Sequence, residues 1–263
     1  MDLGLQGARV LVTAASGGLG AGTARQFSRE GAAVVINSRT LAALQATAAS
    51  INEETGNAVF TVPGDVSQPQ DAQRIVRSAA EYLGGLDVLV INAGGPPGGS
   101  FGDFTPEDWR AAADLTLHSA VNLAYAALPY LRRSSRAAVL TITSQSVKQP
   151  VDNLTLSNAI RPAVMGLTKT LALELGPEGI RVNSILPGIT HTGRVDDLMA
   201  GRAARSGSTA EEELAKAAAA IPLRRVGTVE EFANAAVFLC APAAGYITGV
   251  ALPVDGGSIR ATL

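Results

Sequence analysis

Short apolar runs alternate along the chain with longer segments in which apolar residues recur at helical spacing. Six runs of five or six residues are bounded by turn residues: 9–13, 33–37, 58–62, 86–91, 137–142 and 180–185. The helical segments between and after them are 18–29, 41–52, 69–83, about 105–132 and 156–175. Short apolar strands that alternate with helices indicate a parallel sheet covered on both faces. Because such crossovers are right-handed, the pattern predicts an α/β fold with a doubly wound sheet of about seven strands.

The pattern shows no internal repeat and no linker, so we expect one domain over residues 1–263. The segment 193–220 stands apart because it is rich in alanine and follows a predicted strand directly. A helix is expected within it, with an N-cap at Ser208 or Thr209 and three glutamates in its first turn. The segment is either a surface excursion or a mobile lid over a ligand crevice. Its place after the carboxyl end of a strand favours a substrate lid.

Composition narrows the function classes. The net charge of −2, from 21 Lys and Arg against 23 Asp and Glu, lacks the basic excess of a nucleic-acid binder. There is no apolar run of about 18 residues, so we expect no membrane-spanning helix. Residues 1–7 lack a basic and an apolar signal region, and we expect a cytoplasmic protein. The single cysteine, Cys240, lies in an apolar stretch and is expected to be buried; no metal site is expected.

A glycine-rich loop follows the first predicted strand. It reads Thr13-Ala14-Ala15-Ser16-Gly17-Gly18-Leu19-Gly20 and opens a helix. Glycines in this context let the backbone turn tightly and approach a pyrophosphate at the helix N-terminus. The loop therefore predicts a dinucleotide-binding Rossmann domain.

The same loop resembles the Thr-Gly-x-x-x-Gly-x-Gly loop of the short-chain dehydrogenase/reductase family. Ala14 stands where the first glycine of that family is usual, which we regard as a mild departure that leaves binding intact. Further segments resemble the family at the expected intervals, over nearly the whole chain: Gly64-Asp65-Val66, Asn92-Ala93-Gly94, Pro187 to Thr192, Tyr246 to Gly249 and Val254 to Gly257.

The resemblance implies a set of cofactor-binding residues. Asp65 would touch the adenine, Asn92-Ala93-Gly94 would line the cofactor groove, and the Pro187-Gly188 turn would contact the nicotinamide carboxamide. The candidate cofactor-binding residues are Thr13, Ser16, Gly18, Leu19, Gly20, Ser38, Arg39, Asp65, Val66, Asn92, Ala93, Gly94, Arg161, Pro187, Gly188, Thr190 and Thr192.

The end of the second strand bears on the choice between NAD(H) and NADP(H). Sites that prefer NAD place a carboxylate there to hold the ribose hydroxyls. This chain has Ser38 at that position and Arg39 next to it. The missing acid removes repulsion of a 2′-phosphate, and a guanidinium offers that phosphate two hydrogen bonds. We therefore predict that NADP(H) is preferred over NAD(H), although Arg39 could simply be a solvated residue before a helix.

The catalytic positions depart from the family. Its usual chemistry uses a Ser, a Tyr 13 residues later, a Lys four residues after the Tyr, and an Asn in the long helix before strand five. In this chain Ser144 keeps the serine position, but Ser157 replaces the Tyr and Arg161 replaces the Lys. Thr116 stands at the Asn position. These four residues are the candidate catalytic residues.

The replacements change the available proton chemistry. A serine hydroxyl is a much weaker acid than a phenol, and an arginine stays protonated. Arg161 lies one helical turn from Ser157 and can still provide a positive charge and hydrogen bonds to the nicotinamide ribose. Other sources of the proton are Lys148, His191, His118, or a water molecule held by Ser144 and Ser157.

Three functions remain open. The first is an NADP(H)-dependent oxidoreductase that interconverts carbonyl and alcohol on a small organic substrate by a modified proton path. The second is a dinucleotide-binding protein without redox turnover, and the third is a dehydratase or lyase that uses the same crevice. The fold cannot distinguish them, because function belongs to the site.

The family resemblance further implies a homotetramer. Its contacts would be formed by the two helices at about 105–132 and 156–175 and by the strand 250–254. The apolar spacing in those helices is consistent with this, through Ala120, Val121, Leu123, Ala124, Ala127, Ala163, Val164, Leu167 and Leu171. A core face would show the same spacing.

Overall fold

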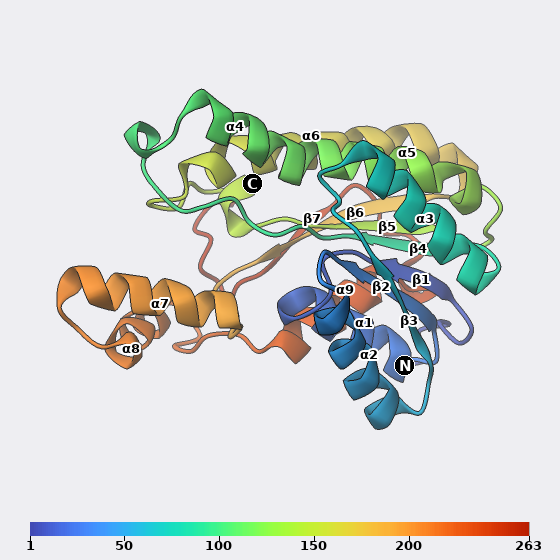
Figure 1. Cartoon of the computed structure of the whole chain (residues 1–263), viewed down its shortest axis with the longest axis horizontal. Coiled ribbons are helices and arrows are strands. Elements are labelled where there is room, and N and C mark those ends of the chain that lie inside the picture. The colour runs from blue at the N-terminus through green and yellow to red at the C-terminus, as the bar shows by residue number, and fades with distance from the viewer. Residues whose placement is uncertain (263) are drawn as a thin grey trace.

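A seven-stranded parallel sheet forms the centre of the computed structural model, which describes residues 1–262 (Figure 1). The strands are β1 Arg9–Val12, β2 Ala33–Ser38, β3 Val59–Pro63, β4 Val88–Ile91, β5 Ala138–Ile142, β6 Arg181–Pro187 and β7 Ala251–Val254. Their order is β3-β2-β1-β4-β5-β6-β7, so the direction of winding reverses between β1 and β4. The predicted fold class, a doubly wound parallel sheet, is confirmed. Such a reversal leaves a crevice at the carboxyl ends of the two strands.

Helices cover both faces of the sheet. The helices are α1 Gly18–Arg29, α2 Leu41–Thr55, α3 Pro69–Leu83, α4 Pro106–Ala113, α5 Ser119–Leu131, α6 Thr155–Leu175, α7 Gly193–Ser206, α8 Ala210–Ala220 and α9 Val229–Cys240. One apolar core lies between the sheet and α1, α2 and α9, and includes Phe27 and Phe232, both fully buried. A second core lies between the other face and α3, α5 and α6, and includes Ile75 and Leu123. Figure 1 shows the two layers above and below the sheet.

Most predicted elements are present, and two helices were missed. The segment 193–220 contains two helices, α7 and α8, where the sequence predicted one. The predicted N-cap is correct, because the Thr209 hydroxyl accepts the backbone N–H of Glu212 and the Glu212 carboxylate accepts the N–H of Thr209. Helix α9 was the other helix not predicted, and Cys240 at its end is buried as expected. Burial raises the pKa of this thiol to about 12, so it does not act as a nucleophile at neutral pH.

The long helix predicted over 105–132 is interrupted. It consists of α4, a π-helical turn at Asp114–His118, and α5. The Thr105 hydroxyl and the Asp108 carboxylate form a capping box that fixes the start of α4. Such π turns often occur at functional sites, and this one contains Thr116.

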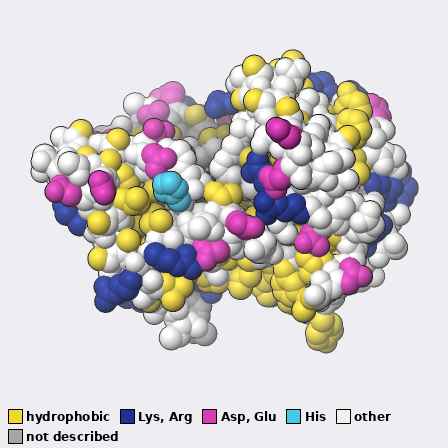
Figure 2. Space-filling model, turned by 90° about the horizontal axis from the view of Figure 1, so that it is seen from below, with side chains coloured by type: hydrophobic (Ala, Val, Ile, Leu, Met, Phe, Trp, Pro, Cys, Tyr) yellow, Lys and Arg dark blue, Asp and Glu magenta, His cyan; other side chains and the backbone are white. Residues whose placement is uncertain are grey.

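The helices α7 and α8 project to one side of the sheet's carboxyl edge (Figure 1). They pack on each other, and five residues separate the first of them from the end of β6. Acidic and basic side chains are interspersed over the face of the molecule seen in Figure 2, without one dominant sign. No helix within the described range is long and apolar enough to cross a membrane.

Ala14 has a backbone conformation that glycine normally supplies. Its φ angle is +46°, in the left-handed region. A side chain in this region clashes with the following carbonyl and costs about 1–2 kcal/mol. The description of Ala14 as a mild departure was therefore incomplete, because the methyl group leaves the loop intact but strains it.

Replacing Ala14 with glycine should raise the free energy of unfolding by about 0.5–1 kcal/mol, because relief of strain exceeds the entropy that glycine adds to the unfolded chain. Urea denaturation of the apoprotein measures the difference. Ala15→Gly is the matched control, since Ala15 is buried and its φ angle is not positive. It should destabilise the protein. Equal effects of the two substitutions would show that Ala14 is not strained.

Candidate active site

The loops after β1 and β4 are tied together at the point where the sheet reverses. The Thr13 hydroxyl donates to the backbone oxygen of Asn92 at 2.7 Å and accepts the Asn92 N–H at 2.9 Å. The Asn92 side-chain amide donates to the backbone oxygen of Ala14 at 3.1 Å. These bonds hold the glycine-rich loop at the edge of the crevice, with Ala93 and Gly94 continuing from the same strand end.

The start of α1 fits a pyrophosphate. Its N-cap, Gly17, provides no side chain to the free N–H groups, and no acidic residue lies in the first turn. A Cβ atom on Gly20 would lie 2.5 Å from the backbone oxygen of Ala14 and 2.9 Å from the Asn92 amide nitrogen. Gly20 therefore lets the helix start close to the strand, and the exposed N–H groups carry the positive end of the helix dipole.

The loop after β6 closes the crevice from the opposite side. A Cβ atom built on Gly18 would lie 3.7 Å from the Thr192 methyl carbon. The backbone N–H of Gly188 donates to Val254 in β7 at 3.0 Å, which fixes the turn that begins at Pro187. Thr190 is buried and forms an isolated β-bridge with Gly227.

The ribose end of the crevice contains an unpartnered polar atom. Ser38 ends β2, and its hydroxyl oxygen is buried without a hydrogen-bond partner in the described chain. Arg39 is exposed beside it. The Asp65 carboxylate accepts the N–H and the hydroxyl of Ser67 at 3.0 and 2.8 Å, while Val66 is buried. The Ser38 hydroxyl and the Arg39 guanidinium are thus both available to a phosphate.

Ser144 and Ser157 approach the crevice from β5 and α6. Ser144 follows β5, and its hydroxyl oxygen accepts the backbone N–H of Ser146 at 3.1 Å. Its own proton remains available to a substrate oxygen. Ser157 lies in the first turn of α6 and is 6% exposed, with no side-chain hydrogen bond to the rest of residues 1–262. Both hydroxyls can therefore bind a substrate or a water molecule.

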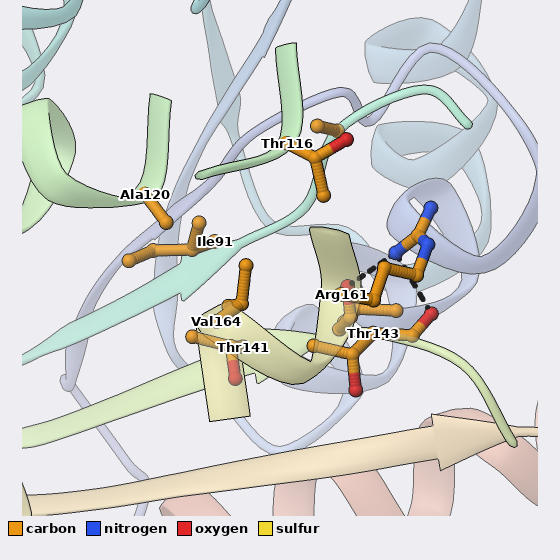
Figure 3. Close-up of a pocket in the computed structure, with 9 residues that line it drawn as sticks. Ile91, Thr116, Ala120, Thr141, Thr143, Arg161 and Val164 are labelled. Atoms are coloured by element: carbon orange, nitrogen blue, oxygen red, sulfur yellow. Dashed lines mark hydrogen bonds between the residues drawn. The ribbon is translucent and has the colours of Figure 1, made fainter. Parts of the chain in front are cut away.

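Arg161 is a buried cation without a carboxylate partner. Its guanidinium donates to the backbone oxygens of Thr143 at 3.0 Å and Ile142 at 3.5 Å, as the dashed lines in Figure 3 show. Burial, and then the positive charge of Arg194, lower the pKa of Arg161 to about 10. The group remains protonated at neutral pH, so it supplies positive charge at the end of β5.

Thr116 shares a small cavity with Arg161. The Thr116 hydroxyl is buried and has no partner in the described chain. The cavity has about 10 Å³ of room for the centre of a water molecule, close to the space that one molecule needs. Thr141, Thr143 and Ile91 are among the other residues that line it (Figure 3). The arrangement suits one water molecule held between the threonine and the guanidinium.

The three alternative proton donors are less well placed. His118 lies on the exposed side of the π turn, with its Nδ1 atom 2.7 Å from a carboxylate oxygen of Asp114. His191 is 60% exposed, and its Nε2 atom lies 3.5 Å from Asp196. Lys148 is half-buried and forms no side-chain hydrogen bond within residues 1–262. Ser144, Ser157, Arg161 and Thr116, which the sequence singled out, lie on the elements that meet at this crevice.

One residue at the site was missed. Arg194, in the first turn of α7, donates to the backbone oxygens of Gly95 at 3.2 Å and Pro96 at 3.1 Å. The only sequence signal for a role of Arg194 at the site was its position in the candidate lid. Its contact with Gly95 and Pro96 could not be predicted, because it joins segments almost a hundred residues apart.

Comparisons with known proteins identify the family of this chain. A family model described as enoyl-(acyl carrier protein) reductase matches residues 13–258. The short-chain reductase protein NovJ of Streptomyces niveus is 34% identical, over 94% of this chain and 92% of its own. The chain belongs to the short-chain dehydrogenase/reductase family.

Two solved structures of reductases or dehydrogenases are similar to this chain over nearly its whole length. L-Sorbose reductase from Gluconobacter frateurii, complexed with NADPH and L-sorbose, is similar with a TM-score of 0.95 and 32% identity, over 99% of this chain and 100% of that one. A short-chain dehydrogenase from Burkholderia cenocepacia in complex with NADP has a TM-score of 0.84 and 30% identity, covering 97% and 99% of the two chains. Nicotinamide dinucleotide binding by this short-chain dehydrogenase/reductase follows from the family and from the crevice described above.

Proposed function

We propose that this short-chain dehydrogenase/reductase is an NADP(H)-dependent oxidoreductase that interconverts a carbonyl and an alcohol on a small organic substrate. The observation that carries the proposal is the buried, carboxylate-free guanidinium of Arg161 beside Ser144 at the end of β5. In the direction of reduction, a carbonyl, NADPH and a proton give an alcohol and NADP⁺. The test is whether the protein oxidises NADPH in the presence of a panel of ketones and aldehydes, followed by cofactor absorbance.

The cofactor would be held by backbone N–H groups and polar side chains that line the crevice. The N–H groups at the start of α1 and Thr192 would contact the pyrophosphate, Ser38 and Arg39 the 2′-phosphate, and Arg161 the nicotinamide ribose. The remaining residues that would line the cofactor are Thr13, Ser16, Gly18, Leu19, Gly20, Asp65, Val66, Asn92, Ala93, Gly94, Pro187, Gly188 and Thr190. When bound, the nicotinamide supplies or accepts a hydride.

Each of the four candidate catalytic side chains has a separate role in the proposed reaction. The Ser144 hydroxyl donates a hydrogen bond to the substrate oxygen and orients it. Arg161 stabilises the negative charge that develops on that oxygen, since it stays protonated in a site shielded from water. The proton is then relayed from solvent through a water molecule held by Ser144 and Ser157, because neither serine is acidic enough to give up its proton without regaining one. Thr116 holds a second water molecule against Arg161.

The segment 193–220 is the proposed substrate lid. Helix α7 follows the carboxyl end of β6, α8 packs against it, and Arg194 joins α7 to the loop after β4. Closure of this pair over the crevice would exclude bulk water from the charge on Arg161.

NADPH should bind this enzyme more tightly than NADH, and Arg39→Asp should erase or reverse the preference. A guanidinium contact with the 2′-phosphate contributes roughly 1.5–3 kcal/mol, which the carboxylate would replace with repulsion. Calorimetric titration with both cofactors measures the difference. Arg77→Asp, an equal charge change at an exposed position of α3, should leave the preference unchanged. Equal affinities in the wild-type protein would disprove the prediction.

The enzyme should be a homotetramer with contacts through α5, α6 and β7. The structure corrects the residues expected to form them, since Ala120, Leu123, Ala127 and Val164 are buried in the core. The exposed apolar side chains on the same helices are Tyr125, 75% exposed, and Leu173, 70% exposed. Light scattering should give the tetramer mass for the wild type and a smaller mass for Tyr125→Asp combined with Leu173→Asp. A monomer at micromolar concentration would contradict the prediction.

A further inference from the structure

Two arginines face the proposed active site without a carboxylate partner. Arg161 donates only to the backbone oxygens of Ile142 and Thr143, and Arg194 only to those of Gly95 and Pro96. Many other arginines of the chain form ion pairs, for example Arg9 with Asp87, Arg74 with Asp71 and Arg225 with Glu231. Arg161 is buried whereas Arg194 is exposed, and a buried charge without a counterion is costly.

The sheet order places Arg194 over the reacting end of the crevice. Arg194 begins α7 just after β6, and the oxygens that it contacts follow β4. Strand β5 lies between these two strands and ends at Ile142, directly before Thr143 and Ser144. The side chain of Arg194 therefore spans the end of β5, and its charge is close enough to lower the pKa of Arg161.

The acidic groups of the neighbouring loops are engaged elsewhere. The Asp103 carboxylate accepts the backbone N–H of Ser100, and the two oxygens of Asp255 accept the N–H groups of Gly257 and Ile259. Asp196, two residues after Arg194, lies beside His191. No carboxylate in residues 1–262 forms an ion pair with Arg161 or Arg194. An anionic ligand bound between the two arginines would supply a compensating charge.

The guanidinium of Arg194 packs against the backbone at Gly95 and Pro96. A Cβ atom on Gly95 would lie 2.5 Å from the Arg194 Nη2 atom and 2.6 Å from Cζ, so the absence of a side chain lets the guanidinium pack against this backbone. The loop itself is anchored to the start of α6, because the Gly99 N–H donates to the backbone oxygen of Asn153 at 2.7 Å. The guanidinium uses two of its five N–H donors on backbone oxygens and keeps the others for a ligand.

We propose that the substrate is an anion whose carboxylate is bound by Arg194 while its carbonyl group lies beside Ser144 and Arg161. The inference rests on the proposed oxidoreductase function, and it assigns Arg194 as the residue that selects acidic over neutral substrates. The planar guanidinium suits a carboxylate, with which it forms two parallel hydrogen bonds. The cofactor's phosphates are the other source of negative charge, and the two sources give different results on substitution of Arg194.

A panel of keto acids of increasing size, each paired with its methyl ester, tests the selectivity. With NADPH, the wild-type enzyme should show a kcat/KM at least about tenfold higher for the best acid than for its ester. Arg194→Gln should lower kcat/KM for the acid by about 10- to 100-fold, mainly through KM, and lower kcat/KM for the ester much less. Arg205→Gln, an exposed position near the end of the same helix, should change neither. Gly95→Ala should lower kcat/KM for the acid more than for the ester, because the added methyl group displaces Arg194 without removing its charge.

Calorimetric binding of the same compounds to the enzyme with NADP⁺ separates this inference from the proposed function. If no carbonyl is reduced but the acids bind better than the esters through Arg194, the redox proposal fails and the anion site stands. Two results would overturn the anion site. One is equal binding of every acid and its ester; the other is a loss of NADPH affinity in Arg194→Gln that affects acids and esters alike, which would assign Arg194 to the cofactor's phosphates.

Discussion

Replacing Arg161 with alanine should lower kcat/KM by about 10²–10³-fold and weaken NADPH binding by about tenfold. The guanidinium is the positive charge nearest the end of β5, and its burial makes that charge effective because little water screens it. Its two hydrogen bonds to Ile142 and Thr143 hold it in place before the substrate arrives. An interaction organised in advance costs no rearrangement during the reaction.

The measurement is kcat/KM on the best carbonyl substrate, with the NADPH dissociation constant determined separately by titration. Arg161→Lys restores the charge and should recover part of both losses. Arg133→Ala is the matched control, because this exposed arginine lies over the ring of Tyr130, away from the crevice. A variant Arg161→Ala with kcat/KM within threefold of wild type, on the order of 0.7 kcal/mol, would exclude Arg161 from the chemistry.

The double change Ser157→Tyr with Arg161→Lys should lower activity, by about tenfold or more, although it rebuilds the pair usual in the family. Ser157 is 6% exposed, so a phenol at this position would occupy space that a substrate or a water molecule uses. If the site had simply lost function by drift, the same change would restore the usual proton donor and raise carbonyl reductase activity.

Single serine variants make this comparison decisive. Ser144→Ala and Ser157→Ala should lower kcat by about 10²–10⁴-fold, the usual range for a disrupted proton path, because each removes a hydroxyl that holds the water molecule, and should leave NADPH affinity unchanged. Steady-state kinetics and cofactor titration on the three variants measure both quantities. Full activity in both single variants would remove the serines from the mechanism, and a gain of activity in the double variant would show that the site is a relic.

Much of the fold could be predicted from the sequence because its signals are local. The bounds of α1 and α3 match the prediction. Gly18 and Pro69 mark the first residues of the two helices, and a glycine follows within two residues of the last residue of each. Helix α7 was missed because the apolar residues that define its buried face are few: only Met199 and Ala203 are buried. Its packing partner is α8, and contacts between helices cannot be derived from the periodicity of one of them.

The candidate site shows the same limit. The spacing of Ser144, Ser157 and Arg161 could be read directly from the sequence, because the helix after Ser157 carries the family pattern without a gap. The contact between Arg194 and Gly95 depends on two loops brought together by the order of three strands. The positive φ angle of Ala14 was also missed, although the glycine that is usual in the family at this position is a signal for that conformation.

The π turn at Asp114–His118 allows α4 and α5 to direct their buried faces differently, although the two helices follow each other without a loop. One additional residue changes the angular phase of a helix by about 100°. As a result α4 can turn Ala112 towards Leu156 and Ile160, while α5 turns Leu123 and its neighbours into the main core. Deleting one residue from this turn would point the buried faces of α4 and α5 in the same direction. Either the wall beside Thr116 or the core under α5 would then lose its packing.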